Sequence, residues 1–211
     1  MRIPIASEGY PFILVSIVIT IFFLWLGWRP FAYILILWTI FVIAFFRDPE
    51  REIPTNENAI VSPADGKVII VDKVFEDRFL KSDAIKISIF MNVFNVHVNR
   101  NPVSGKVTGI FYNQGKFLSA NLDKASLENE QNAVVVESLE GKKIVYVQIA
   151  GLIARRIVCY LKEGDTVEKG KRFGMIRFGS RLDVYLPPEY KIDVKVGDKV
   201  KAGSSILGYW Q

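Results

Sequence analysis

The chain has 211 residues but only one cysteine, Cys159, and one histidine, His97. A lone cysteine cannot form an internal disulfide, which agrees with a reducing compartment. Cys159 lies in an apolar run, where a buried structural thiol is the expected role. A zinc-type site needs several His, Cys or carboxylate ligands close together, and no cluster of carboxylates accompanies either residue. We therefore predict that the protein binds no metal.

Charged residues are almost absent from the first part of the chain. Residues 10–28 contain no Asp, Glu, Lys or Arg, and residues 31–46 form a second uncharged run. The first run is long enough for a membrane-spanning helix, and the second is short for one. No A-x-A-like site follows the first run, which argues against a cleaved signal peptide. Residues 1–46 therefore predict a membrane-associated helical hairpin with its turn at residues 28–30, which either spans the bilayer or dips into one leaflet.

Basic residues outnumber acidic ones by 27 to 22, which favours an anionic membrane face or an acidic substrate as partner. Arg2, Arg47 and Arg51 flank the hairpin, whereas its turn holds only Arg29. By the positive-inside tendency, we expect the following domain on the cytoplasmic side of the cell membrane. The basic residues form no stripe with interleaved aromatics, so we expect no nucleic-acid partner.

The second part of the chain, residues 47–211, reads as one β domain. Short runs of alternating apolar and polar residues are separated by Gly, Pro, Asn and Asp, which is typical of many short strands. Residues 85–89, 143–150 and 181–186 show this strand pattern, and only residues 119–129 read as a helix or loop.

Two pairs of segments in this domain resemble each other. Residues 63–68 (PADGKV) resemble 102–107 (PVSGKV), and residues 164–170 (GDTVEKG) resemble 197–203 (GDKVKAG). The form G-D-x-V-x-x-G places a tight turn between strands. Paired turns of this kind resemble the barrel-sandwich hybrid fold of lipoyl and biotinyl carrier domains, although no carrier lysine stands at a hairpin tip. The predicted fold class is mainly β, with a barrel-sandwich-hybrid-like core preceded by an N-terminal hydrophobic helical hairpin.

His97 lies in an alternating polar and apolar segment. On a strand, Asn95, His97 and Asn99 would share one face, around a side chain that exchanges a proton near neutral pH. A histidine beside asparagines is also a common hydrogen-bonded structural residue, and the local sequence alone favours that alternative.

Gly179 and Ser180 lie between two strand-like runs. Glycine allows another group to approach its carbonyl closely, and the Ser180 hydroxyl could attack that carbonyl and cut the chain. Asp65 lies in an Asp-Gly turn, and together with His97 and Ser180 it supplies an orienter, a base and a nucleophile. The alternative for the Gly179-Ser180 pair and for the Asp65-Gly66 pair is an ordinary turn between strands. No G-x-S-x-G elbow occurs, which argues against an α/β-hydrolase.

Arg155 and Arg156 are adjacent within an apolar segment. Burying an arginine is costly without an anionic partner. A substrate phosphate or carboxylate and an internal salt bridge are equally good partners on this pattern.

Together these segments resemble the phosphatidylserine decarboxylase proenzyme family, in its short prokaryotic and archaeal form. The matching segments, in chain order, are 46–51 (FRDPER), 62–66 (SPADG), 95–100 (NVHVNR), 112–130, 148–151 with 154–156 (QIAG and ARR), 178–181 and 183–187. The chain departs from the longer members of the family at two places. Gly-Ser-Arg replaces the usual Gly-Ser-Thr, and Phe94 stands where a second histidine is usual.

The resemblance implies that the chain cleaves itself between Gly179 and Ser180. His97, oriented by Asp65, would take the Ser180 proton, and Ser180 would end as an N-terminal pyruvoyl group. The large chain, 1–179, and the small chain, 180–211, would stay bound to each other.

The resemblance also implies the reaction. A pyruvoyl group is an electron sink for loss of CO₂, the task that pyridoxal phosphate (PLP) performs elsewhere, so neither PLP nor a metal is expected. The expected substrate is an anionic aminophospholipid, phosphatidylserine, which becomes phosphatidylethanolamine in phospholipid biosynthesis. His97 is the expected proton donor, and Arg155, Arg156, Asn95 and Asn99 are candidates for substrate binding.

Two alternatives stay open at this point. The same chemistry could act on archaetidylserine, because the lipid tails leave no trace in the sequence. The chain could instead be a non-catalytic, membrane-tethered β-sandwich adaptor that is never cut. The oligomeric state, including a homo-oligomer, is open as well.

Overall fold

The computed structural model of the chain describes residues 4–115, 129–138, 141–151, 156–177 and 180–210. By its contacts the chain divides into two compact units, residues 1–50 and residues 51–211. Each unit is described by itself.

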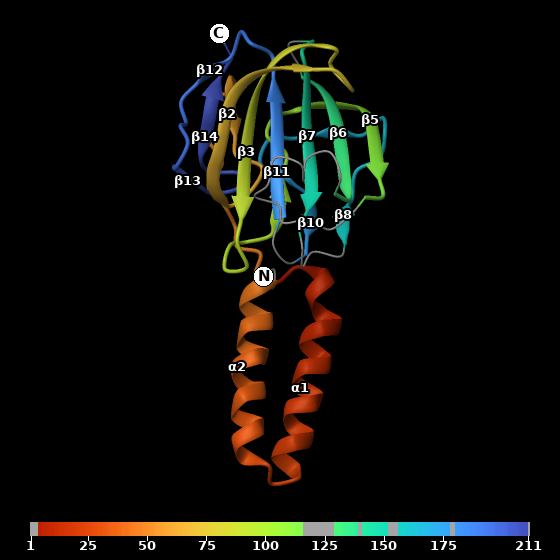
Figure 1. Cartoon of the computed structure of the whole chain (residues 1–211), viewed down its shortest axis with the longest axis vertical. Helices are drawn as coiled ribbons and strands as arrows, with labels where there is room; N and C mark the ends of the chain where they lie inside the picture. The colour runs from red at the N-terminus through yellow and green to blue at the C-terminus, as the bar shows by residue number, and fades with distance from the viewer. Residues whose placement is uncertain (1–3, 116–128, 139–140, 152–155, 178–179, 211) are drawn as a thin grey trace. The chain divides into compact units, whose positions relative to one another are not determined.

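The first unit is a pair of apolar helices, α1 (Tyr10–Trp25) and α2 (Arg29–Phe45), preceded by the 3₁₀ turn η1 (Ser7–Gly9). Figure 1 shows the two helices side by side and antiparallel. Most of their apolar side chains are exposed, whereas Thr20 and Thr39 are buried with their hydroxyl oxygens 3.1 Å apart. The helical segment Ser7–Trp25 is long and apolar enough to cross a membrane, and α2 is shorter. The predicted helical hairpin is confirmed.

The turn of the hairpin lies earlier than predicted, between Trp25 and Arg29. Gly27 adopts a positive φ of 76°, a conformation that glycine adopts without steric cost. Pro30 lies in the first turn of α2, where its missing N–H would have had no helical partner. The placement of the turn at residues 28–30 was therefore wrong, because Pro30 begins a helix rather than ending one.

The second unit is built almost wholly of antiparallel strands, so the mainly β class is confirmed. The strands are β1 (Ala59–Val61), β2 (Gly66–Glu76), β3 (Ser82–Met91), β4 (Val98–Arg100), β5 (Gly105–Asn113), β6 (Gln131–Ser138), β7 (Lys143–Ala150), β8 (Ile157–Cys159), β9 (Thr166–Val167), β10 (Arg172–Ile176), β11 (Ser180–Leu186), β12 (Lys191–Ile192), β13 (Lys199–Val200) and β14 (Ile206–Tyr209). Residues 119–128 of the segment predicted as helix or loop lie outside the described residues.

In the described part of the β domain, the strands form three sheets around a large hydrophobic cluster. A curled eight-stranded sheet has the order β13-β2-β3-β11-β7-β6-β5-β9, and two three-stranded sheets have the orders β1-β14-β12 and β4-β10-β8. One hydrophobic cluster takes Leu182 from the large sheet, Phe173 from β10 and Ile60 from β1. The inner face of β11 therefore points into the interior of the domain.

The repeated sequence segments pair with each other in space. The start of β2 pairs with β13, and the start of β5 pairs with β9. In both places a valine N–H donates to an aspartate backbone carbonyl, Val68 to Asp198 at 2.9 Å and Val107 to Asp165 at 2.8 Å. The two corners, each made of one P-x-x-G and one G-D-x-V segment, thus close opposite edges of the large sheet in the same way.

Candidate active site

Ser180 is the first residue of β11, the strand between β3 and β7. Its Cα partners are Met91 at the end of β3 and Ala150 at the end of β7. The side chain is fully buried, and its Oγ makes no hydrogen bond with a described residue. A buried polar group without a partner typically costs about 1–3 kcal/mol, which makes this hydroxyl a candidate functional group. Gly179 lies outside the described residues.

His97 lies at the same end of the sheets as Ser180. The Ile176 N–H donates to the His97 carbonyl at 3.4 Å, and Ile176 precedes Ser180 by four residues. The His97 ring is fully buried, with Nδ1 3.0 Å from the Asn95 carbonyl oxygen. A carbonyl can only accept, so Nδ1 carries the hydrogen and the lone pair of the neutral ring is on Nε2. That tautomer is the one that a general base needs.

Asn95 has a different place from the one predicted. The strand β4 begins only at Val98, and Asn95 lies in the turn before it. Its side-chain oxygen accepts the N–H of Asn92 at 2.9 Å, while its backbone carbonyl holds the His97 ring. These contacts position the turn and the histidine.

The Asp65 carboxylate is held by groups other than His97. Arg51 Nη2 lies 3.0 Å from Oδ1 and 2.8 Å from Oδ2, and the Ala202 N–H donates to Oδ1 at 2.8 Å. Among the described residues, the Asp65 carboxylate is therefore hydrogen-bonded to Arg51 and Ala202, whereas His97 Nδ1 is hydrogen-bonded to the Asn95 carbonyl. The Asp65 turn still contacts β4, the strand that follows His97, because the Pro63 carbonyl accepts the N–H of Arg100 at 2.9 Å.

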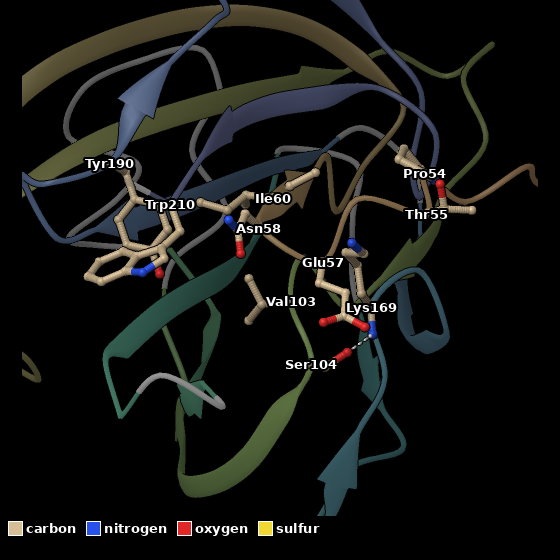
Figure 2. A pocket seen from close by; sticks show the side chains of 11 residues that line it. Pro54, Thr55, Glu57, Asn58, Ile60, Val103, Ser104, Lys169, Tyr190 and Trp210 are labelled. Atoms are coloured by element: carbon tan, nitrogen blue, oxygen red, sulfur yellow. Dashed lines mark hydrogen bonds between the residues drawn. The ribbon is translucent and has the colours of Figure 1, made fainter.

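The other repeated corner offers a comparison for Asp65. Ser104 occupies the place of Asp65 in P-V-S-G, and its Oγ accepts the N–H of Lys169 at 2.9 Å (Figure 2). Lys169 in turn occupies the place of Ala202 in the G-D-x-V-x-x-G segment. In both corners the side chain thus accepts the N–H at the equivalent position, Lys169 for Ser104 and Ala202 for Asp65. The contact with Arg51 occurs only in the Asp65 corner among the described residues.

A chain of buried amides lines the sheet face that carries Ser180. Gln148 is the cross-strand partner of Leu182, two residues after Ser180 on the same face. Its amide nitrogen donates to Asn99 Oδ1 at 3.0 Å, and its oxygen accepts from Asn132 at 3.1 Å. Asn99 is fully buried, and its own amide nitrogen lies 3.8 Å from the sulfur of Met91. Asn99, predicted to bind substrate, is therefore occupied at both ends of its amide.

A comparison with known proteins decides the family. The family model described as phosphatidylserine decarboxylase matches residues 38–208. The chain belongs to the phosphatidylserine decarboxylase family. A phosphatidylserine decarboxylase proenzyme of Syntrophus aciditrophicus is 58% identical over 207 residues, covering 97% of this chain and 96% of its own length.

Two further relatives with the same description extend this match. The protein of Geotalea uraniireducens is 54% identical and covers 97% of this chain and 96% of its own length. The protein of Desulfotalea psychrophila is 50% identical, with coverage of 98% and 97%. The similarity thus extends over nearly the whole decarboxylase chain.

A second group of polar residues in this decarboxylase lies across β7 from Ser180. The N–H of Ala150 donates to the Glu130 carbonyl, and the Asn129 side chain donates to the Ala150 carbonyl at 2.7 Å. Ser180, Ala150 and Glu130 therefore form one row across neighbouring strands. At about 4.8 Å per strand, Glu130 lies roughly 10 Å from Ser180.

The Glu130 carboxylate is buried and has two donors. The Tyr112 hydroxyl donates to it at 3.0 Å, and the Ile157 N–H at 3.4 Å. Burial and the Glu130 contact raise the pKa of Tyr112, so the phenol remains a donor at neutral pH. Arg156 adjoins Ile157 and is exposed, and its charge acts on Tyr112 in the opposite direction. Arg155 lies outside the described residues.

Sequence reasoning missed several residues of the candidate site. Arg51 was predicted only to help orient the hairpin. Gln148, Asn132 and Glu130 carried no predicted role, although the run Asn129-Glu130-Gln131-Asn132 places four polar residues together at the start of a strand. All four residues of the run are buried. A polar run on a strand that then becomes hydrophobic is the signal that could have pointed to them.

The cavity in Figure 2 is separate from these residues. It has a volume of about 220 Å³ and lies between Tyr190 and Trp210 on one side and Lys169 and Glu57 on the other. Neither Ser180 nor His97 lines it. Within the described part of the chain, no three His, Cys, Asp or Glu side chains lie together as metal ligands would.

Proposed function

We propose that this chain is a proenzyme that cuts itself between Gly179 and Ser180 and then decarboxylates phosphatidylserine to phosphatidylethanolamine. The observation that carries the proposal is the Ser180 hydroxyl, which is buried at the start of the central strand β11 and has no hydrogen-bond partner among the described residues. The base tautomer of the nearby His97 supports it. The substrate is supported by relatives at 50–58% identity that are phosphatidylserine decarboxylase proenzymes by name.

Self-cleavage begins when His97 takes the Ser180 hydroxyl proton and Oγ attacks the Gly179 carbonyl carbon. The Gly179–Ser180 amide bond breaks and an ester to Oγ forms, with the Ser180 nitrogen protonated. Loss of the Ser180 Cα proton then breaks the Cβ–Oγ bond and releases the Gly179 carboxylate. Water hydrolyses the resulting enamine through its imine, ammonia leaves, and a ketone remains at residue 180. The products are chains 1–179 and 180–211.

The surroundings of Ser180 fit a pyruvoyl group. Such a group supplies a ketone that joins the substrate amine and accepts the electrons left by CO₂. Pairing with Met91 and Ala150 on either side holds residue 180 in place after the chain is cut. The proposal requires no PLP and no metal. His97 returns a proton to the substrate carbon once CO₂ has left.

Asp65 acts in this proposal as a positioning residue. It is joined to Arg51 and to the Ala202 N–H, and its turn is hydrogen-bonded to the strand that follows His97. Asn95 and Asn99 likewise hold the histidine and the amide chain rather than the lipid. We assign the lipid phosphate to Arg156, which is exposed beside the Glu130 group, or to Arg155.

The helical hairpin is proposed to anchor the enzyme to the cell membrane with the β domain on the cytoplasmic side. The segment Ser7–Trp25 is apolar enough for this role. Membrane attachment brings the active site to a substrate that is itself part of a bilayer, so the lipid need not cross water. Archaetidylserine would fit the same chemistry, but the relatives' descriptions favour phosphatidylserine.

The test uses Ser180→Ala, which removes the nucleophile and leaves the fold. The variant should run as a single chain of 24.0 kDa and release no CO₂ from phosphatidylserine. Ser138→Ala, which changes another buried serine on β6, should be cut and active like the wild type. A wild-type chain that stays whole would support the adaptor alternative instead. A Ser180→Ala chain that is still cut after Gly179 would refute the self-cleavage step.

A further inference from the structure

The turn after β3 presents a large apolar side chain to solvent. Phe94 is 73% exposed, although His97, three residues later, is fully buried. Val93 beside it is half-buried. Single exposed apolar residues are common on protein surfaces, but Phe94 is distinguished by its position and by the hydrogen bonds of its turn.

Phe94 lies at the active-site end of the large sheet. Met91, the last residue of β3, is the direct partner of Ser180, the first residue of β11. In Figure 1 the end of the β3 arrow and the start of β11 lie at the same edge of the sheet. Phe94 follows Met91 by three residues, so the turn projects from the edge where the nucleophile lies.

Hydrogen bonds keep the turn from folding its apolar side chain inward. Asn92 accepts the Phe94 N–H through its side chain at 2.9 Å and the Asn95 N–H through its carbonyl at 3.0 Å. The Asn95 side chain accepts the Asn92 N–H at 2.9 Å. The Asn95 carbonyl also holds the His97 ring at 3.0 Å. The exposed tip and the proposed base are thus parts of one hydrogen-bonded unit.

Basic residues lie at the same end of the β domain. The Ile176 N–H donates to the His97 carbonyl, and the N–H of Arg177, the next residue, donates to the Arg156 carbonyl at 3.2 Å. Arg156 is exposed and Arg177 is half-buried. An apolar tip and cationic side chains at the same end of the β domain match the two layers of an anionic membrane surface, acyl chains below and charged head groups above.

We propose that Val93 and Phe94 form a membrane-contact tip that inserts between the head groups of an anionic bilayer and aligns the active-site end with its lipid. The proposal rests on the proposed function, because it assumes a substrate that lies in a bilayer. Such a tip would set the position of the active site on the surface, in addition to the attachment that the helical hairpin supplies.

The test compares Phe94→Ser with Phe75→Ser in the full chain, reconstituted in vesicles of phosphatidylserine and phosphatidylcholine. Phe75 is 65% exposed and pairs with Asp83 near the other end of β3, so it is a matched control. Both variants should cut themselves fully, which shows that they fold. Phe94→Ser should turn over vesicle phosphatidylserine roughly five- to tenfold more slowly than the wild type. The loss should appear mainly as a larger surface fraction of phosphatidylserine needed for the half-maximal rate. Phe75→Ser should match the wild type.

A soluble short-chain phosphatidylserine separates surface contact from chemistry. Phe94→Ser should act on it at the wild-type rate, and Phe94→Leu should restore activity on vesicles. Equal losses on both substrates, or no loss on vesicles, would overturn the membrane-contact tip. If the wild type neither cuts itself nor releases CO₂, the proposed function fails instead, so the two failures are distinct.

Discussion

Arg181, next to the proposed cleavage site, is a fully buried charged side chain. It makes two hydrogen bonds to Asp183, at 2.6 Å and 3.0 Å, and a third to the Ser88 hydroxyl on β3 at 3.0 Å. Lys86 adds a second cation 3.3 Å from Asp183. The sequence suggested no role for Arg181. The contacts show that it forms a buried ion pair on the outer face of β11, opposite the face of Ser180.

Loss of one partner of this pair should be costly, because it leaves a charge buried alone. Arg181→Met in an uncut Ser180→Ala background should lower the free energy of unfolding by about 3–5 kcal/mol. Replacing both partners, Arg181→Met with Asp183→Leu, should cost less than half as much. Urea unfolding in mild detergent, followed by circular dichroism, measures both. A double variant less stable than the single one would contradict a buried pair.

Asp65 gives a second prediction at the scale of residues. If Asp65 acts through Arg51 and its corner, Arg51→Ala and Asp65→Asn should slow self-cleavage by similar factors, and the double variant should be no slower than either. Ser104→Ala, the matched change in the other corner, should cleave at the wild-type rate. The time course of chain cleavage after synthesis measures all four. An Asp65→Asn effect far larger than that of Arg51→Ala would instead indicate direct action on His97.

At the scale of elements, the sequence indicated where several strands lie but not which strands pair or in what register. Alternation marked β3, β7 and β11, because a strand with one buried face shows a period of two. It could not show that Ser180 lies opposite Met91, or that Gln148 lies opposite Leu182. Register depends on pairing between distant segments, and short-range patterns do not contain it. The sequence could therefore suggest candidate residue types for the site, whereas it could not show the contacts of Asp65 and of the amide chain.

The close strand approach at the glycines of the two repeated corners should make substitutions there destabilising. A Cβ at Gly66 would lie 2.2 Å from the Phe90 carbonyl oxygen, and a Cβ at Gly105 would lie 2.2 Å from that of Glu137. Both contacts involve backbone, so the strands would have to move apart. Gly66→Ala and Gly105→Ala should each lower stability by about 1–3 kcal/mol. Thermal unfolding in the Ser180→Ala background measures this, and a neutral result for either glycine would contradict the close strand approach.

At the scale of the whole molecule, the β domain should lose stability at alkaline pH. Burial raises the pKa of the Cys159 thiol from its ordinary 9.0, and it raises the pKa of the Tyr146 and Tyr185 hydroxyls above their ordinary 10.0. The unfolded chain therefore loses these protons first as pH rises. Stability should be full below about pH 9 and should fall above it, by up to about 1.4 kcal/mol per pH unit for each group.

Melting temperatures between pH 7 and pH 11 test this dependence. The variant Cys159→Ala with Tyr185→Phe should show a shallower decline than the wild type, because two of the shifted groups are gone. Identical slopes would show that other groups govern alkaline unfolding.

The central claim is that Ser180 first cuts the chain and then becomes the reactive group. Intact mass spectrometry of the purified wild-type protein tests it most directly. The account predicts two chains, residues 1–179 and 180–211. The small chain should be about 17 Da lighter than a form that begins with serine, because conversion of Ser180 into a pyruvoyl group loses one ammonia overall. A single chain of 24.0 kDa, or a small chain that keeps an unmodified N-terminal serine, would contradict the account.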